Sequence, residues 1–556
     1  MKKRSLSWVI ALGMNAALFA FVALFCDVRF ALNDDSGILR AFLGYETGTP
    51  ASFHIYIHGL LAKPLYWLSC AFPGVMWYSW MQLALLFLAQ TVISKSIMQC
   101  FVKHEKPLWL GAVFALIVLC AFAPGYTAQF TFTQTAAFLG AAAVLQLFSI
   151  DFGRKWKVIV GMLGAAMLSA FAYALRQITL LPVLAFCALA FLYLLWEHRR
   201  ESLRPMLISL GLIVVLLGSL VIGREIEIRQ SGYEDYLAWQ DANAYVIDYY
   251  GVRNLTQEEL DLVGWSESTV EMAYNWCFLN SDLSTENFLT LNKALEGKES
   301  PRAGLGQVLG ASMRSKPAEW RMLALGLLAA VIVCVFCWKK QRMAALAMLL
   351  ALLGACAMLC YLATEGRLPL RALLMVLLPF TAFAMALLPR APVCSKGSAV
   401  IALVMAAWMA FNLCSIVPGL LRSEEDDMAM GSAFADMEEY AVWEPESLFI
   451  YDVAMIGADT RAFPEYPDGI PHNVTFWGGW GLRSPENIEL FENFGIDLMN
   501  FEPETFLRDD VFLVTSRVDP PPTLILNWLR ETVSPDIDWE IWSECGSAYI
   551  LHFYEY

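Results

Sequence analysis

Long apolar runs recur along the chain and predict helices that cross a membrane. There are about eleven, each close to the roughly 20 residues that span a hydrocarbon core of about 30 Å. A long polar stretch, residues 224–317, separates the first seven runs from the last four. The runs cover residues 6–26, 75–93, 108–123, 132–150, 158–175, 178–196, 206–223, 318–338, 343–362, 372–388 and 399–420. The pattern therefore predicts a mainly α-helical, polytopic transmembrane bundle.

Basic residues in alternate loops predict the orientation of this bundle. Lys2, Lys3 and Arg4 precede the first run, and the positive-inside bias places such residues in the cytoplasm. The loops rich in Lys and Arg are 95–106, 154–157, 197–204, 339–342 and 390–396. With the N-terminus inside, the alternation puts the first loop, the polar stretch and the C-terminus outside. We therefore expect a multi-pass cell-membrane protein with an extracytoplasmic C-terminal domain.

The polar segments divide the chain into four parts. Residues 1–223 form a transmembrane module, and its first outer loop is 27–74. This loop contains an apolar run at 53–68, which is too short and too interrupted to span the membrane. We interpret the run as an interfacial helix. Residues 224–317 form an outer, mostly helical insertion, in which Thr256 and Glu259 make a capping box. Residues 318–420 form a second transmembrane module, and residues 421–556 form a small outer α/β domain.

The C-terminal part carries the signals of a folded α/β domain. Strands are predicted at 447–451 and 511–514, helices at 431–440 and 524–533, and a closing hairpin from 539–542 and 549–554. From residue 418 onward there are 28 Asp and Glu against 6 Arg and no Lys. Such an acidic domain excludes nucleic acid as a partner, because phosphates need Lys and Arg. No Walker, dinucleotide or zincin motif is present.

The sequence Asn33-Asp34-Asp35 follows directly on the first predicted span. Carboxylates at the mouth of a membrane bundle are costly and usually functional, so Asp34 and Asp35 are the candidate catalytic residues. The alternative is that they cap an interfacial helix beginning near Ser36-Gly37. The two roles are compatible.

Four arginines are predicted on the outer side, against the positive-inside bias. They are Arg176, Arg224, Arg367 and Arg371. The planar guanidinium makes paired, charge-assisted hydrogen bonds to phosphate, so these residues are the candidate phosphate-binding set. Pairing with the acidic insertion, or extension to lipid headgroups, are the alternatives.

A divalent metal ion is the one cofactor that the sequence suggests. His54 and His58 are four residues apart, one helical turn, and in a helix they would face Asp34 or Glu46 as metal ligands. No third ligand is fixed by spacing, and packing at the membrane interface explains the pair equally well. The cofactor therefore stays open.

In its topology the chain resembles the C-type integral-membrane glycosyltransferases, which use polyprenyl-phosphate sugars. The resemblance lies in Asn33-Asp34-Asp35 after the first span, the interfacial helix, the long outer loop after the seventh span and the outer C-terminal domain. It implies that the carboxylate of Asp34 or Asp35 acts as general base on an acceptor hydroxyl, or helps to bind a metal. Stretches 264–276 and 478–485 are similar to segments of bacterial multi-pass proteins, which implies no mechanism.

The resulting hypothesis is transfer of a sugar from a polyprenyl-phosphate donor to a cell-surface glycan or lipid acceptor on the outer face of the membrane. The partners would be membrane lipid, the lipid-linked sugar and the acceptor. A transporter or flippase is the first alternative, but its spans would carry ionisable residues at their centres, and these spans are almost free of them. A polysaccharide polymerase or ligase is the second, and the sequence does not separate it from a transferase.

Overall fold

The computed structural model describes nearly the whole chain. The described residues are 2–298, 304–364, 368–393, 395–421, 424–452, 459–479, 481–516, 522–546 and 548–556. Side chains are described for all of these except 2, 395 and 424–433.

Ten helices in the described residues are long and apolar enough to cross a membrane. They are α1 (Lys2–Phe25), α4 (Trp77–Lys103), α5 (Leu108–Ala128), α6 (Phe132–Ser149), α7 (Lys155–Leu175), α8 (Leu180–Ser231), α14 (Pro317–Cys337), α15 (Arg342–Thr364), α16 (Leu370–Leu387) and α17 (Ser395–Ile416). Helix α8 has 52 residues and a non-helical backbone at Ser202, so it contains two of the predicted spans. The prediction of a polytopic helical bundle with a small α/β domain is confirmed.

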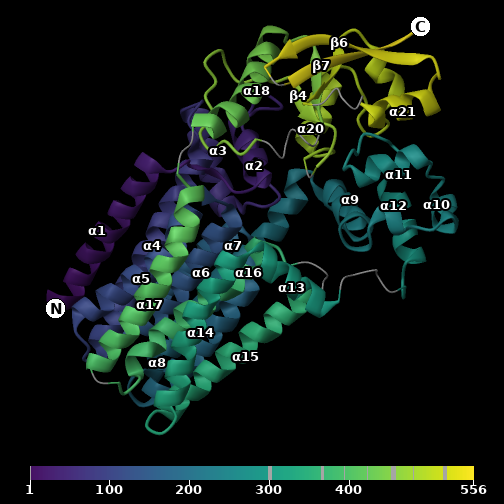
Figure 1. The fold of residues 1–556 in the computed structure, drawn as a ribbon. Coiled ribbons are helices and arrows are strands. Elements are labelled where there is room, and N and C mark those ends of the chain that lie inside the picture. Colours follow the sequence, from purple (N-terminus) through teal and green to yellow (C-terminus); the bar gives the residue numbers. More distant parts are fainter. Residues whose placement is uncertain are drawn as a thin grey trace.

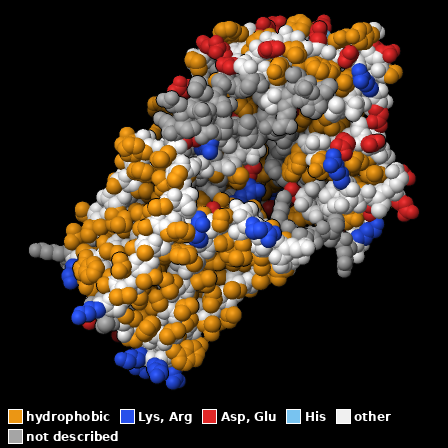
Figure 2. Space-filling model, in the orientation of Figure 1, with side chains coloured by type: hydrophobic (Ala, Val, Ile, Leu, Met, Phe, Trp, Pro, Cys, Tyr) orange, Lys and Arg blue, Asp and Glu red, His pale blue; other side chains and the backbone are white. Residues whose placement is uncertain are grey.

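Helices α6 and α16 form the centre of the bundle and are almost wholly buried. Helices α1, α8 and α17 lie at the periphery of the bundle and keep most of their apolar side chains exposed, for example Leu181 and Leu403. Figure 2 shows this apolar surface covering the length of the bundle, with charged side chains confined to its ends and to the domains. An exposed apolar surface of this extent is suited to contact with lipid.

The first loop folds over one end of the bundle. It contains β1 (Arg29–Phe30), α2 (Asn33–Leu43) and α3 (Gly59–Ala71), and β1 pairs in parallel with β2 (Gln129–Phe130) just before α6. The predicted interfacial helix at 53–68 is wrong in its first part, because the helix begins only at Gly59. Residues 53–58 are irregular since Arg224 holds the carbonyl groups of His54 and Ile55 by hydrogen bonds.

The insertion and the C-terminal domain lie together at this same end of the bundle (Figure 1). The insertion contains α9 (Glu234–Ala244), α10 (Gln257–Val263), α11 (Glu267–Tyr274), α12 (Thr285–Ala294) and α13 (Leu305–Ser315). The predicted capping box of Thr256 and Glu259 is present at the start of α10. Large side chains of both parts, among them Trp239, Phe278 and Phe491, share one hydrophobic core. The insertion and the domain therefore form one layer.

The C-terminal domain is built on a five-stranded sheet with the order β4-β3-β5-β7-β6. Strand β3 (Leu448–Tyr451) is parallel to β4 (Val474–Phe476) and β5 (Val511–Thr515), while β7 (Ala548–Glu555) is antiparallel to β5 and β6 (Ile537–Cys545). Its helices are α18 (Glu424–Trp443), α20 (Pro485–Asn493) and α21 (Thr523–Thr532). The predicted strands, helices and hairpin are present, and β4 and α20 are additional.

Candidate active site

A cavity of about 390 Å³ lies where the first loop, the insertion and the C-terminal domain meet. We call it the domain-side cavity. Its acidic lining comprises Asp34, Glu46 and Glu486, and its aromatic lining comprises Tyr56, Tyr233, Tyr236, Trp276 and Phe476. Figure 2 shows a hollow between the bundle and the two polar parts, with acidic and basic side chains inside it. Carboxylates beside aromatic rings suit a polar ligand with an apolar face, such as a sugar.

Asp34 faces this cavity and pairs with Arg371. Its Oδ2 accepts a hydrogen bond from Arg371 Nη1 at 2.5 Å, and the side chains of Arg371 and Asp34 are 34% and 20% exposed. Arg371 lies in the first turn of α16, the central helix of the bundle, whereas Asp34 lies in the first turn of α2. The structure thus brings together two predicted site residues that are 337 positions apart.

Arg176 lies close to this pair. It follows α7 directly, and its guanidinium stands over the rings of Tyr56 at 4.9 Å and Phe132 at 5.3 Å. Within the described part of the chain its side chain has no hydrogen-bond acceptor and no ion-pair partner. Burial lowers the pKa of Arg176, and Arg371 and Asp34 are near enough to act on its charge in opposite directions. Arg176 is therefore a cation with unused donors beside the Asp34–Arg371 pair.

Asp35 points away from the cavity and fastens α2 to the bundle. Its Oδ1 accepts hydrogen bonds from Tyr78 Oη at 2.8 Å, Gln82 Nε2 at 2.6 Å and the backbone N–H of Phe132 at 3.0 Å. The side chain is fully buried, and Oδ2 has no partner in the described structure. Burial raises the pKa of Asp35 to about 7, although the three hydrogen bonds oppose this. This geometry suits a positioning residue.

The capping alternative for the two carboxylates is wrong in its geometry. Helix α2 begins at Asn33 rather than near Ser36, and its N-cap is Leu32, which makes no side-chain capping bond. Asp34 and Asp35 lie inside the first turn, where the helix dipole still favours negative charge by roughly 0.3–1 kcal/mol.

Arg40 forms part of the cavity wall and links α2 to the C-terminal domain. It is buried and pairs with Asp459, which also pairs with Arg461 at 3.0 Å. The guanidinium of Arg40 lies 5.1 Å from the ring of Tyr45 and 5.0 Å from that of Phe476. Burial alone would raise the pKa of Asp459, but Arg40 and Arg461 hold it below its usual value. Sequence reasoning missed Arg40, because its partner is 419 residues away.

A second pair of carboxylates, Glu46 and Glu486, lines the cavity. Glu46 accepts a hydrogen bond from Asn487 Nδ2 at 3.1 Å, and Glu486 accepts one from the hydroxyl of Tyr233. Burial, and then the negative charge of Glu486, raise the pKa of Glu46 to about 7. Glu486 and Asn487 belong to α20, which sequence reasoning did not find, although the stretch 478–485 leads into it.

Glycines in that stretch allow the domain to approach the insertion closely. The backbone of Gly478 bridges to Cys277, and the N–H of Phe278 donates to the carbonyl of Trp477 at 2.8 Å. A Cβ on Gly478 would lie 1.4 Å from the carbonyl oxygen of Trp276. Only glycine fits there, and the contact closes one side of the cavity. Trp480 lies outside the described residues.

The remaining predicted phosphate-binding residues are placed differently. Arg224 donates to the carbonyl groups of His54 at 3.0 Å and Ile55 at 2.5 Å and has its guanidinium 4.6 Å from the ring of Phe53. It supports residues 53–58 and, like Arg371 and Arg176, is absent from the described lining of the domain-side cavity. Arg367 lies outside the described residues, so its phosphate role stays a prediction.

The two histidines do not form the predicted metal pair. His54 lies before α3, in irregular backbone, and its Nδ1 accepts from the N–H of Tyr56 at 3.2 Å. His58 Nδ1 accepts from Leu60 N–H at 2.9 Å, and Nε2 lies 2.9 Å from the carbonyl oxygen of Leu220. With one nitrogen accepting and the other facing an acceptor, His58 has no lone pair for a metal. No group of three or more His, Cys, Asp or Glu suited to a metal occurs among the described residues.

Comparison with known proteins finds similarity among solved structures. No protein-family model and no curated protein matches the chain. A solved structure, ArnT from Cupriavidus metallidurans bound to undecaprenyl phosphate, is similar over 98% of this chain and 97% of its own, with 12% sequence identity and a TM-score of 0.40.

Proposed function

We propose that this chain transfers a sugar from a polyprenyl-phosphate donor to a glycan or lipid acceptor in the domain-side cavity. The observation that carries the proposal is the ion pair of Asp34 and Arg371, which joins a carboxylate to a side chain suited to phosphate at the mouth of the bundle. Arg176 adds a second guanidinium beside it. A base and a phosphate clamp are the two groups that such a transfer requires.

In the proposed reaction the acceptor hydroxyl attacks the anomeric carbon while Asp34 accepts its proton. The new carbon–oxygen bond forms as the bond from the anomeric carbon to the phosphate oxygen breaks. The departing polyprenyl phosphate takes the electron pair, and Arg371 and Arg176 stabilise its negative charge by charge-assisted hydrogen bonds. Asp35 acts by positioning, since its three hydrogen bonds fix the first turn of α2.

In the proposed mechanism the donor binds before Asp34 acts as a base. Without a donor, Arg371 occupies Asp34 Oδ2, so the carboxylate is a poor base. A donor phosphate competes for Arg371 and leaves Asp34 free to accept a proton. Asp34 is then an effective base only when the leaving group is in place.

The walls of the cavity suit a sugar ring. Tyr233, Tyr236 and Trp276 offer apolar faces, and Glu46 and Glu486 offer acceptors for hydroxyl groups. A volume of about 390 Å³ lies within the range of small-molecule sites, roughly 300–1,000 Å³.

Lipid analysis of cells tests the proposal whichever sugar is transferred. Membranes are prepared from cells that carry the chain or its Asp34→Asn variant at matched protein level, and polyprenyl phosphates are measured by mass spectrometry. The active chain should raise free polyprenyl phosphate at the expense of its glycosylated form, and the variant should not. The control is Asp261→Asn, which changes an exposed carboxylate of α10. Equal lipid profiles with and without the chain would refute transfer.

The proposed reaction takes place outside the cytoplasm. Fused reporters test this orientation of the chain in the membrane. A reporter after Tyr556 should be active outside the cell, and one after Lys339 should be active inside, because the basic loops alternate along the chain. The opposite result for either fusion would remove the case for chemistry on the outer face.

A further inference from the structure

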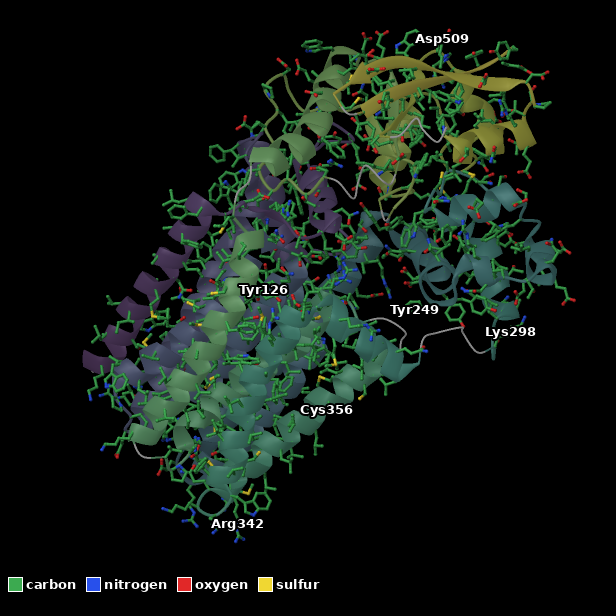
Figure 3. The ribbon with its side chains drawn as sticks, viewed as in Figure 1. Tyr126, Tyr249, Lys298, Arg342, Cys356 and Asp509 are labelled. Carbon is green, nitrogen blue, oxygen red and sulfur yellow. The ribbon has the colours of Figure 1, made fainter. Side chains whose placement is uncertain are left out.

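A second cavity, of about 820 Å³, lies at the end of the bundle opposite the two domains. We call it the basic cavity. Its walls come from the middle of α8, the turn between α14 and α15, and the segment that follows α16. Arg342, labelled at the lower end of the bundle in Figure 3, marks its place. The candidate active site makes no use of it.

Five exposed cations line the basic cavity. They are Arg199, Arg200, Lys339, Lys340 and Arg342. In the described part of the chain none of these side chains makes a hydrogen bond or an ion pair. They come from two segments about 140 residues apart in the sequence, yet they converge on one hollow. Figure 2 shows Lys and Arg side chains gathered at this lower end.

The acidic side chains of the cavity do not neutralise this charge. Glu197 is occupied by Arg390, which donates to Oε1 at 2.5 Å and to Oε2 at 2.7 Å. Among the described lining residues that leaves the carboxylate of Glu201 against five cations. The cavity therefore has an excess of positive charge and suits an anion.

The back wall of the cavity is fixed. Arg390 is buried, and its guanidinium lies 5.0 Å from the ring of Tyr193, which also lines the cavity. His198 stacks on Phe152 at 3.9 Å, next to Glu197. The exposed cations thus border a formed hollow, whereas the positive-inside bias requires only that basic residues lie near the ends of spans.

The position of the cavity favours a lipid headgroup over a soluble anion. Helix α14 ends at Cys337 and α15 begins at Arg342, so the turn lies where two spans leave the hydrocarbon core. Trp338 and Trp196 are exposed beside it, as aromatic side chains at a membrane surface are. Met343 and Ala344 line the cavity from the first turn of α15, where the positive end of the helix dipole favours an anion.

We propose that the basic cavity binds the headgroup of an anionic phospholipid. Arg199 and Arg200 approach the phosphate from α8, and Lys339, Lys340 and Arg342 approach it from the α14–α15 turn. The acyl chains lie along the exposed apolar side chains of α8 and α15, such as Leu192 and Leu350. The bound lipid bridges the two transmembrane modules at the end where no domain joins them.

Lipid titration of the purified full-length chain tests this proposal. Native mass spectrometry measures binding of phosphatidylglycerol and of phosphatidylcholine to the wild type, to the double variant Lys339→Gln/Lys340→Gln, and to a matched control. The control is Arg154→Gln/Lys155→Gln, which removes two exposed cations at the start of α7 outside the described lining of the cavity. All variants are compared at the same salt concentration.

The wild type should prefer phosphatidylglycerol, and the cavity variant should lose about fivefold in affinity for each cation removed, since a basic residue at an anionic surface contributes about 1 kcal/mol. The control should keep the preference. An equal loss in both variants would show a general charge effect and overturn the proposal, as would a wild type without preference. Inorganic phosphate at millimolar concentration is added in a separate arm, and abolition of lipid binding there would assign the cavity to a free anion. Because a wild type without preference overturns the proposal by itself, misfolding of a variant leaves the proposal falsifiable.

Discussion

Replacement of Asp34 by Asn separates proton acceptance from structure at the candidate active site. The amide keeps the size of the carboxylate and one oxygen for Arg371, but it does not accept a proton. The pair of side chains is 34% and 20% exposed, so its contribution to stability is about 0–1 kcal/mol. Loss of a general base costs about 10² to 10⁴ in rate, or roughly 3–5 kcal/mol of activation free energy. The effect on chemistry should therefore far exceed the effect on folding.

The assay compares the rate of polyprenyl phosphate release in membranes with matched amounts of protein. Asp35→Asn serves as the neighbouring control, because Asp35 is outside the described lining of the domain-side cavity. We expect a loss of about 10² or more for Asp34→Asn and less than about tenfold for Asp35→Asn. A wild-type rate for Asp34→Asn would refute the role of general base, and equal losses for both variants would show that only the position of α2 matters.

Three further predictions concern Arg371, Asp35 and Gly478. Arg371→Ala should lower kcat/KM for a polyprenyl-phosphate donor by roughly tenfold to a hundredfold. Arg371→Lys should keep only part of the wild-type kcat/KM, since a paired contact becomes a point charge. Wild-type kinetics for the Ala variant would contradict the phosphate role. Because burial raises the pKa of Asp35 from 3.8 to about 7, the folded chain holds a proton that the unfolded chain releases. Thermal stability in detergent should therefore fall as the pH rises between these values, and Asp35→Asn should flatten the slope; an unchanged slope would count against this. Gly478→Ala should cost about 1–3 kcal/mol, because its Cβ would meet the carbonyl of Trp276, whereas Gly354→Ala meets nothing and should be tolerated; equal unfolding temperatures for the two variants would refute the close approach.

The bundle could be predicted because its signal is local. The length of an apolar run is enough to predict a membrane-spanning helix, and all eleven predicted runs correspond to helices. Strand β4 has three residues and pairs only through its position beside β3, so its own sequence carries little signal. The start of α3 escapes prediction for a similar reason. Its preceding residues are apolar, but Arg224, from a distant helix, holds them in irregular backbone.

The candidate site could be predicted only in part. The sequence indicates carboxylates after the first span and arginines near later spans as candidate site residues, and the structure pairs two of them, Asp34 and Arg371. It could not separate Asp34 from Asp35, because adjacent residues of a helix point in different directions and only packing decides which faces the cavity. Glu486 and Tyr233 come from parts of the chain whose approach depends on contacts between domains. No local pattern reports such contacts.

The buried pair of Arg40 and Asp459 also bears on how the protein is made. A ribosome delivers the chain from its N-terminus, so α2 is in place long before Asp459, which follows every one of the spans. Until then Arg40 lacks both this counter-ion and the ring of Phe476 beside it, so nothing fastens α2 to the C-terminal domain. An interrupted copy of the protein thus differs from a finished one in the stability of its first loop. Membrane proteases, which act on loosely held segments, would remove incomplete copies, and only completed molecules would keep a closed cavity.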